Sequence, residues 1–181
     1  MRIAVATPTG NVGRHVVTML IRAGVRPFAL ARNPDRLAAD VRSEVDVVEV
    51  DQFDADAVVL ATAGVDSLHW VDPPAGSADP LVDYGRATTN VARAVTENGI
   101  GHVVFQSSVG AEKRQGVGEI DGLAATEAAL DETPSAVTHL RCVAERARRL
   151  SRCRFAVGQR RSQRSRRRGR RHARRRLLVL R

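Results

Sequence analysis

The chain has 181 residues, which is enough for one ordinary domain with a tail and excludes a large multidomain enzyme. Its net charge of +9 divides unevenly, because residues 141–181 hold 18 arginines and one acid, Glu145, whereas the first 140 residues hold 11 basic and 19 acidic side chains. Both cysteines, Cys142 and Cys153, lie at or beyond that boundary, which excludes a disulfide framework in the acidic body. The start is too short for a signal peptide and no apolar run approaches 18 residues, so we expect a cytoplasmic protein without a membrane partner.

Short β-branched runs alternate with longer segments of helical period up to about residue 140. Strands are expected at 2–6, 26–31, 45–50, 65–71, 102–106 and 136–140, and helices at 11–23, 34–40, 54–62, 79–99 and 118–131. This alternation predicts an α/β fold, a doubly wound parallel sheet of the Rossmann type, over residues 1–141. Residues 142–181 are expected to form an Arg-rich, disordered tail, because their composition cannot bury a core.

The connection between the first strand and the first helix carries two glycines, in the run Thr7-Pro8-Thr9-Gly10-Asn11-Val12-Gly13. In a dinucleotide-binding unit, glycines here allow a tight turn and close approach to the pyrophosphate, and the helix N-terminus supplies oriented N–H groups. Gly10 and Gly13 keep the last two glycine positions, whereas Thr7 stands where the first glycine is usual. As the first turn of an alternating chain, this loop predicts a nucleotide site.

The end of the second predicted strand, about 20 residues after the glycine loop, reads Ala31-Arg32-Asn33 and has no acid before Asp35. An acid at this place would bind the ribose 2′-hydroxyl of NAD, whereas an arginine pairs with the 2′-phosphate of NADP. Arg32 therefore favours NADP(H) over NAD(H). The alternative is an ordinary surface arginine, since arginines are common on protein surfaces.

Five segments together resemble the NmrA-like group of atypical short-chain dehydrogenases. They are the glycine loop continued by Arg14, the run 31–34, the run 71–74, the run 102–111, and Asp121-Gly122-Leu123 followed by Thr126-Glu127. The resemblance covers residues 1–142, and the glycine loop and the serine run at 107–108 are its specific parts. The group includes redox-sensing regulators and NADPH-dependent reductases, quinone reductases among them.

The resemblance implies a Rossmann domain that binds NADP(H). The pyrophosphate would lie at Thr7, Thr9, Gly10, Asn11, Val12 and Gly13, and the 2′-phosphate at Arg32. The adenine would lie near Asp51, Gln52 and Phe53, and the ribose and nicotinamide would be flanked by Val71, Pro73, Gln106, Ser107 and Ser108. The implied function is reduction of a small, quinone-like electron acceptor, or sensing of the cofactor without turnover.

The chain departs from the family where the Arg-rich segment begins. Family members continue after the sixth strand into a region that closes over the substrate, so this Rossmann domain is expected to be C-terminally incomplete. Arginine without lysine is typical of an out-of-frame reading of a GC-rich gene, which would make the chain an inactive family member. The remaining alternative is weak, salt-dependent nucleic-acid binding through the tail, in which only Phe155 could stack on a base.

Typical short-chain dehydrogenases use a Tyr-x-x-x-Lys pair, in which the tyrosine transfers a proton. This chain has one tyrosine, Tyr84, and one lysine, Lys113, 29 residues apart. By the resemblance the pair would fall near Glu119 and Leu123, so we expect the paired acid to be absent. A quinone acceptor can take its protons from water, and Tyr84 is not expected to contribute to its reduction.

Other candidate residues give weaker signals. Ser107 and Ser108 stand where a substrate-orienting serine would be, although a serine after a strand is more often an ordinary hydrogen-bonding loop residue. The five histidines show no metal-ligand spacing, which disfavours a zinc or iron site. His69 and Trp70 end a predicted strand, where one of them could touch nicotinamide or substrate; packing against a helix is the favoured alternative.

Overall fold

The computed structural model describes residues 1–73 and 76–142, which form one sheet of six strands. The strands are β1 (Ile3–Ala6), β2 (Phe28–Ala31), β3 (Asp46–Glu49), β4 (Ser67–Trp70), β5 (His102–Ser108) and β6 (Ala136–Cys142). They lie in the order β3-β2-β1-β4-β5-β6, and each neighbouring pair is parallel. The predicted doubly wound Rossmann sheet is thus confirmed.

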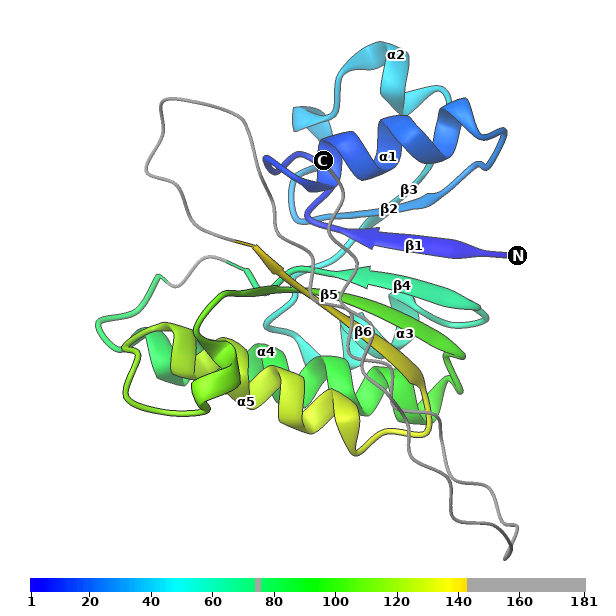
Figure 1. Ribbon diagram of the computed structural model, residues 1–181. Coiled ribbons are helices and arrows are strands. Elements are labelled where there is room, and N and C mark those ends of the chain that lie inside the picture. The colour runs from blue at the N-terminus through cyan, green and yellow to red at the C-terminus, as the bar shows by residue number, and fades with distance from the viewer. Residues whose placement is uncertain (74–75, 143–181) are drawn as a thin grey trace, which may run out of the picture.

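Helices cover both faces of the sheet (Figure 1). The first face carries α1 (Gly13–Arg22) and α2 (Ala39–Arg42), and the second carries α3 (Ala55–Ala61), α4 (Pro80–Glu97) and α5 (Ile120–Asp131). Two single-turn 3-10 helices, η1 (Pro34–Arg36) and η2 (Ala111–Lys113), lie in loops. Among the described residues, none of the helices has both the length and the apolar character needed to cross a membrane.

Apolar side chains pack on both faces of the central strands. On β1, Val5 joins a smaller cluster with Val17 of α1, whereas Ala4 and Ala6 join the larger cluster beneath α3, α4 and α5. The larger cluster contains Trp70 and Phe105, which are both fully buried. Burial on two sides explains why the strands read as continuous apolar runs and not as an alternating pattern.

The structure differs from the predicted elements mainly in one helix and in two strands. The segment 34–40 is not one helix, because Leu37 has an extended backbone (φ −74°, ψ 131°) and points its buried side chain into the core between η1 and α2. Strands β5 and β6 run further than expected, since their pairing continues to Ser107 with Arg141 and Ser108 with Cys142. The expected tail lies outside the described residues, apart from Cys142, which ends β6.

The order of the strands fixes where a ligand can bind. From β1 the chain builds outward to β2 and β3, then returns to the other side of β1 with β4 and builds outward to β5 and β6. Because the strands are parallel, all six carboxyl ends lie at one edge of the sheet. The crevice between the ends of β1 and β4, where the winding direction reverses, is the place where open α/β sheets bind ligands.

A buried carboxylate joins β4 to the two helices beneath it. Asp72, which is 8% exposed, accepts hydrogen bonds from the Trp70 indole N–H (2.8 Å) and from the Thr126 hydroxyl of α5 (2.8 Å). The Thr126 hydroxyl also lies 2.6 Å from the hydroxyl of Thr88 on α4. Burial raises the pKa of Asp72 to about 6, although the hydrogen bonds from Thr126 and Trp70 act in the opposite direction. The ionised form is therefore tolerated at neutral pH and not favoured.

This raised pKa predicts how stability changes with pH. Because the folded protein holds the Asp72 proton more tightly than the unfolded chain, the free energy of unfolding should fall as pH rises from about 4 to about 6. A shift of about two pKa units corresponds to about 3 kcal/mol. Asp72→Asn can still accept from Trp70 and should be more stable than the unmodified protein above pH 6, by about 1–3 kcal/mol.

Urea unfolding between pH 4 and pH 7.5 measures this difference. The exposed Asp40→Asn is the control, and its curve should follow that of the unmodified protein. An Asp72→Asn protein that is less stable at pH 7 and keeps the same pH dependence would contradict the assignment.

Candidate functional site

A cavity of about 370 Å³ lies at the carboxyl ends of the first four strands. Its lining comes from four segments: Thr7, Pro8, Thr9 and Gly10; Leu30, Ala31, Arg32, Asn33 and Arg36; Val50, Asp51 and Gln52; and Pro73. The segments follow β1, β2, β3 and β4 respectively, so the cavity begins at the crevice and extends over the β2 and β3 side of the sheet.

The glycine loop turns tightly before α1. Thr7 has a left-handed backbone (φ 49°), and its carbonyl accepts a hydrogen bond from the Gly10 N–H (2.9 Å). A Cβ atom on Gly13 would lie 2.1 Å from the Thr7 carbonyl oxygen, so only glycine lets α1 start this close to the loop. No side chain caps the first turn of α1 and no acid lies in it. The positive end of the helix dipole is therefore not neutralised by the helix's own side chains.

Two arginines lie at the end of β2, on the rim of the cavity. Arg32 and Arg36 are exposed, and neither guanidinium makes an ion pair or hydrogen bond with the described residues. The nearby acid is already paired, because Asp35 lies 3.2 Å from the Arg42 guanidinium. Asn33 starts the η1 turn by accepting a hydrogen bond from the Asp35 N–H (3.1 Å), and this turn brings Arg36 back to the side of Arg32.

The end of β3 supplies the opposite wall. The side-chain amide of Gln52 donates to the Val71 carbonyl (2.9 Å), and Asn90 of α4 donates to the Gln52 carbonyl (2.9 Å). Gln52 thereby ties the end of β3 to the end of β4. Asp51 is exposed and accepts from the Phe53 N–H (3.0 Å), whereas the Phe53 ring does not line the cavity and lies 5.3 Å beneath the Arg86 guanidinium.

The serines predicted to follow β5 lie inside that strand. Ser107 faces α5 and is 4% exposed, and its hydroxyl donates to Glu127 (2.6 Å). The Ser108 hydroxyl lies within hydrogen-bond distance of the Val109 and Cys142 carbonyls (3.2 and 3.3 Å). The expectation of a serine loop was wrong because pairing with β6 extends β5 to its last serine. Gln106 is half-buried, and its side-chain oxygen has no partner among the described residues.

Glu127 is a fully buried carboxylate held by several donors. Arg141 of β6 binds it with two nitrogens (2.6 and 2.8 Å), and Arg114 lies 3.2 Å away. Burial alone would raise the pKa of Glu127, but the hydrogen bonds from Arg141 and Ser107 outweigh it and leave the pKa below its usual value. This ionised group locks α5 against the ends of β5 and β6 and so has a structural role.

The predicted site residues separate into three groups. Those that line the cavity are Thr7, Thr9, Gly10, Arg32, Asp51, Gln52 and Pro73. Asn11, Val12 and Gly13 connect the glycine loop to α1 and do not themselves line the cavity. The other predicted residues outside the cavity lining are Phe53, Val71, Gln106, Ser107 and Ser108. The sequence reasoning missed Pro8, Leu30, Ala31, Asn33, Arg36 and Val50. Except for Arg36, which the η1 turn brings back to the cavity, their place at or next to the ends of the first three strands was the signal that could have found them.

The two aromatic residues that end β4 point to opposite faces. Trp70 is fully buried in the cluster beneath α3, α4 and α5, so the packing alternative holds for it. His69 faces the α1 side, is 6% exposed, and has no hydrogen-bond partner among the described residues at either ring nitrogen. Burial lowers its pKa to about 4, which keeps the imidazole neutral at pH 7. Residues 1–73 and 76–142 contain no group of three His, Cys, Asp or Glu side chains that could hold a metal ion.

Comparison with known proteins gives relatives of greater length. An uncharacterized protein of Mycobacterium tuberculosis is 35% identical over 109 residues, which are 60% of this chain and 12% of that protein. The triphenylmethane reductase of a Citrobacter species, solved with NADP(H), is 26% identical with a TM-score of 0.67 over 78% of this chain and 49% of that one. The chain thus spans a small part of the curated relative and about half of this solved structure.

A second solved structure has the same fold at lower identity. It is an NADPH-dependent quinone oxidoreductase of Escherichia coli in complex with NADPH, 24% identical with a TM-score of 0.66 over 77% of this chain and 48% of that one. The family model described as NAD(P)H-binding matches residues 8–147, well over half of the sequence. With its Rossmann sheet, its glycine loop and the cavity beside them, this chain belongs to the NAD(P)H-binding family.

Proposed function

We propose that the chain binds NADP(H) in preference to NAD(H) and that the protein uses it to reduce a small, quinone-like acceptor. The observation that carries the cofactor preference is the position of Arg32 and Arg36 on the rim of the cavity, where neither guanidinium has a partner among the described residues. A 2′-phosphate is the group that distinguishes the two cofactors, and guanidinium groups bind phosphate through charge-assisted, often paired hydrogen bonds. Asp35, the acid that follows Arg32 in the sequence, does not line the cavity and lies 3.2 Å from the Arg42 guanidinium.

The rest of the site suits a dinucleotide bound in one orientation along the carboxyl edge of the sheet. The uncapped start of α1 and the close turn at Gly13 suit the pyrophosphate, which needs N–H donors and no intervening side chain. With the 2′-phosphate at β2, the adenosine half fills the cavity over β2 and β3. The reacting half then lies across the crevice, over the ends of β4 and β5, and when bound the cofactor supplies hydride there.

The acceptor class rests on the comparisons. The Citrobacter reductase acts on triphenylmethane dyes, and the Escherichia coli enzyme acts on quinones. Both classes are conjugated molecules that accept a hydride. The alternative, a sensor that binds the cofactor without turnover, predicts NADPH binding with no oxidation by any quinone, so a single assay of NADPH absorbance with and without a naphthoquinone separates the two.

The cofactor preference should depend on both arginines. We expect the unmodified protein to bind NADPH about ten- to a hundredfold more tightly than NADH, which is the ratio that roughly 1.5–3 kcal/mol from a charged hydrogen bond gives. Arg32→Ala should remove most of this ratio and Arg36→Ala a smaller part, while the affinity for NADH stays the same. Cofactor fluorescence measures all six affinities, for the unmodified protein and the two variants with each cofactor.

The control for these variants is Arg22→Ala, an exposed arginine in the last turn of α1 and far along that helix from the loop. It should leave both affinities unchanged. Equal binding of NADPH and NADH by the unmodified protein would sink the proposed preference.

The strained first position of the glycine loop gives a separate prediction. A β-branched residue with positive φ is strained, and glycine adopts that backbone freely. Thr7→Gly should therefore retain or raise the affinity for NADPH, measured by the same fluorescence titration. A loss of more than about 1 kcal/mol, or about fivefold, would show that the Thr7 hydroxyl itself binds the phosphate.

A further inference from the structure

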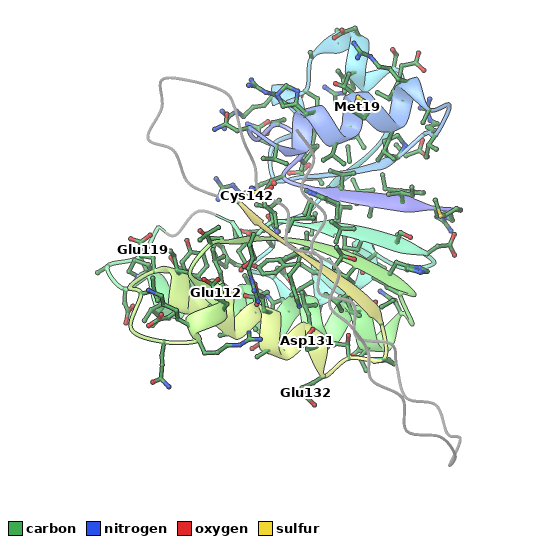
Figure 2. The ribbon with its side chains drawn as sticks, in the orientation of Figure 1. Met19, Glu112, Glu119, Asp131, Glu132 and Cys142 are labelled. Carbon is green, nitrogen blue, oxygen red and sulfur yellow. The ribbon has the colours of Figure 1, made fainter. Side chains whose placement is uncertain are left out.

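Gln52 lies in the connection that crosses the carboxyl edge of the sheet from β3 to α3. β3 is an edge strand, and β2 and β1 separate it from β4 in the sheet. Gln52 nevertheless reaches the carbonyl of Val71, the residue that follows β4. The connection therefore passes the ends of β2 and β1. In Figure 2, Cys142 marks the carboxyl edge of the sheet, where β6 ends, and Glu119 lies on the same side of the molecule.

The side-chain amide of Gln52 has one orientation, which its partner fixes. A backbone carbonyl can only accept a hydrogen bond, so the amide nitrogen has to face the Val71 carbonyl, at 2.9 Å. The Oε1 atom then points away from Val71. This oxygen has no hydrogen-bond partner among the described residues, and the protein does not enclose it. Because Gln52 is only 7% exposed and lines the cavity, its open oxygen faces that cavity.

Asn90 fixes the backbone of Gln52 at the same point. The Asn90 amide donates to the Gln52 carbonyl (2.9 Å), and Asn90 itself is buried in the middle of α4. Gln52 is thus held at its backbone by α4 and at its side chain by the end of β4. An acceptor held in this way loses little conformational entropy when a ligand binds to it.

The wall of the cavity beside Gln52 is apolar. Leu30 and Ala31 end β2, Val50 follows β3, and all three side chains are buried and line the cavity. The Val50 N–H donates to the Ala31 carbonyl (3.1 Å), which holds the two strand ends together. A flat, largely apolar ring that carries a donor at its edge suits such a wall.

We propose that Gln52 selects the base of the cofactor, and that its Oε1 atom accepts a hydrogen bond from the exocyclic amino group of adenine. The inference rests on the proposed function, which puts the 2′-phosphate at Arg32 and Arg36 and the adenosine half over β2 and β3. Adenine presents an amino donor where hypoxanthine and guanine present a carbonyl oxygen. The Gln52 amide cannot turn over to suit that oxygen, because its own oxygen would then face the Val71 carbonyl. Hypoxanthine and guanine are therefore rejected by two opposed acceptors.

Asp51 is the neighbouring acceptor in the cavity lining. Its side chain is exposed, and its Oδ1 atom already accepts from the Phe53 N–H (3.0 Å). A hydrogen bond to an exposed carboxylate replaces one to water, so it separates the bases less than a bond to the buried amide of Gln52.

The base preference is the ratio of the affinities for NADPH and for its hypoxanthine analogue, reduced nicotinamide hypoxanthine dinucleotide phosphate. We expect the unmodified full chain to bind NADPH about tenfold more tightly, which is the upper range for one hydrogen bond. Gln52→Met keeps an unbranched side chain of similar length and removes the amide, so its two affinities should agree within about twofold. Cofactor fluorescence measures each affinity.

Two further variants separate the acceptor oxygen from the fold. Gln52→Glu keeps an oxygen in the cavity and should keep most of the preference for the adenine cofactor, although it loses the hydrogen bond to Val71 and binds both cofactors more weakly. Gln115→Met replaces an exposed glutamine outside the cavity lining. It is the matched control and should change neither affinity.

The inference and the proposed function fail in different ways. Equal binding of the two bases by the unmodified protein, an unchanged preference in Gln52→Met, or a lost preference in Gln52→Glu would overturn the inference and leave the preference for NADPH over NADH intact. A base preference that Asp51→Asn removes and Gln52→Met keeps would assign the selection to the exposed carboxylate and overturn the inference as well. Failure of the unmodified protein to bind NADPH would overturn the proposed function itself.

Discussion

The hydrogen bonds around the buried Asp72 carboxylate are the interaction on which the arrangement of β4, α4 and α5 depends. A carboxylate buried without a cation is costly unless its oxygens are hydrogen-bonded, and here one oxygen takes the Trp70 indole and the other the Thr126 hydroxyl. Satisfying both oxygens requires α5 to lie where Thr126 reaches the end of β4 and where Thr88 reaches Thr126. These hydrogen bonds fix the position of α5 relative to α4 at the level of Thr88 and Thr126. Pro73, the residue after Asp72, lines the cavity.

The charged side chains are distributed unevenly on the two sides of the crevice. On the β2 side, Arg32 and Arg36 present positive charge with no partner among the described residues. On the β4 side lie the buried Asp72 and, at the start of α5, Glu119, while Glu127 deeper in the fold is neutralised by Arg141. An elongated ligand with a negative end and an uncharged reacting end would align with this field. The arginines proposed to bind the 2′-phosphate and the buried carboxylate Asp72 thus lie on opposite sides of the switch point.

Local patterns in the sequence predicted the strands of the sheet, the glycine loop and the position of Arg32 at the end of β2, because each of these depends on residues close together in the chain. Arg36 was missed because the turn begun by Asn33 and Pro34, and not a helix, brings it back to Arg32. The side chain of Ser107 was misplaced because the length of β5 depends on its pairing with β6. The contact between Tyr84 and Gly122 could not be predicted for a similar reason, since α4 packs on α5 through buried hydrogen bonds between residues 38 or more positions apart.

The contact between Tyr84 and Gly122 also constrains how the chain can evolve. Any side chain at position 122 would overlap the ring, and a smaller residue at position 84 would leave a gap over the first turn of α5. Neither position can change alone without cost, so a substitution at one favours a compensating substitution at the other. Homologous chains should therefore fall into two compatible sets, with an aromatic residue facing glycine in one and a small residue facing a larger side chain in the other.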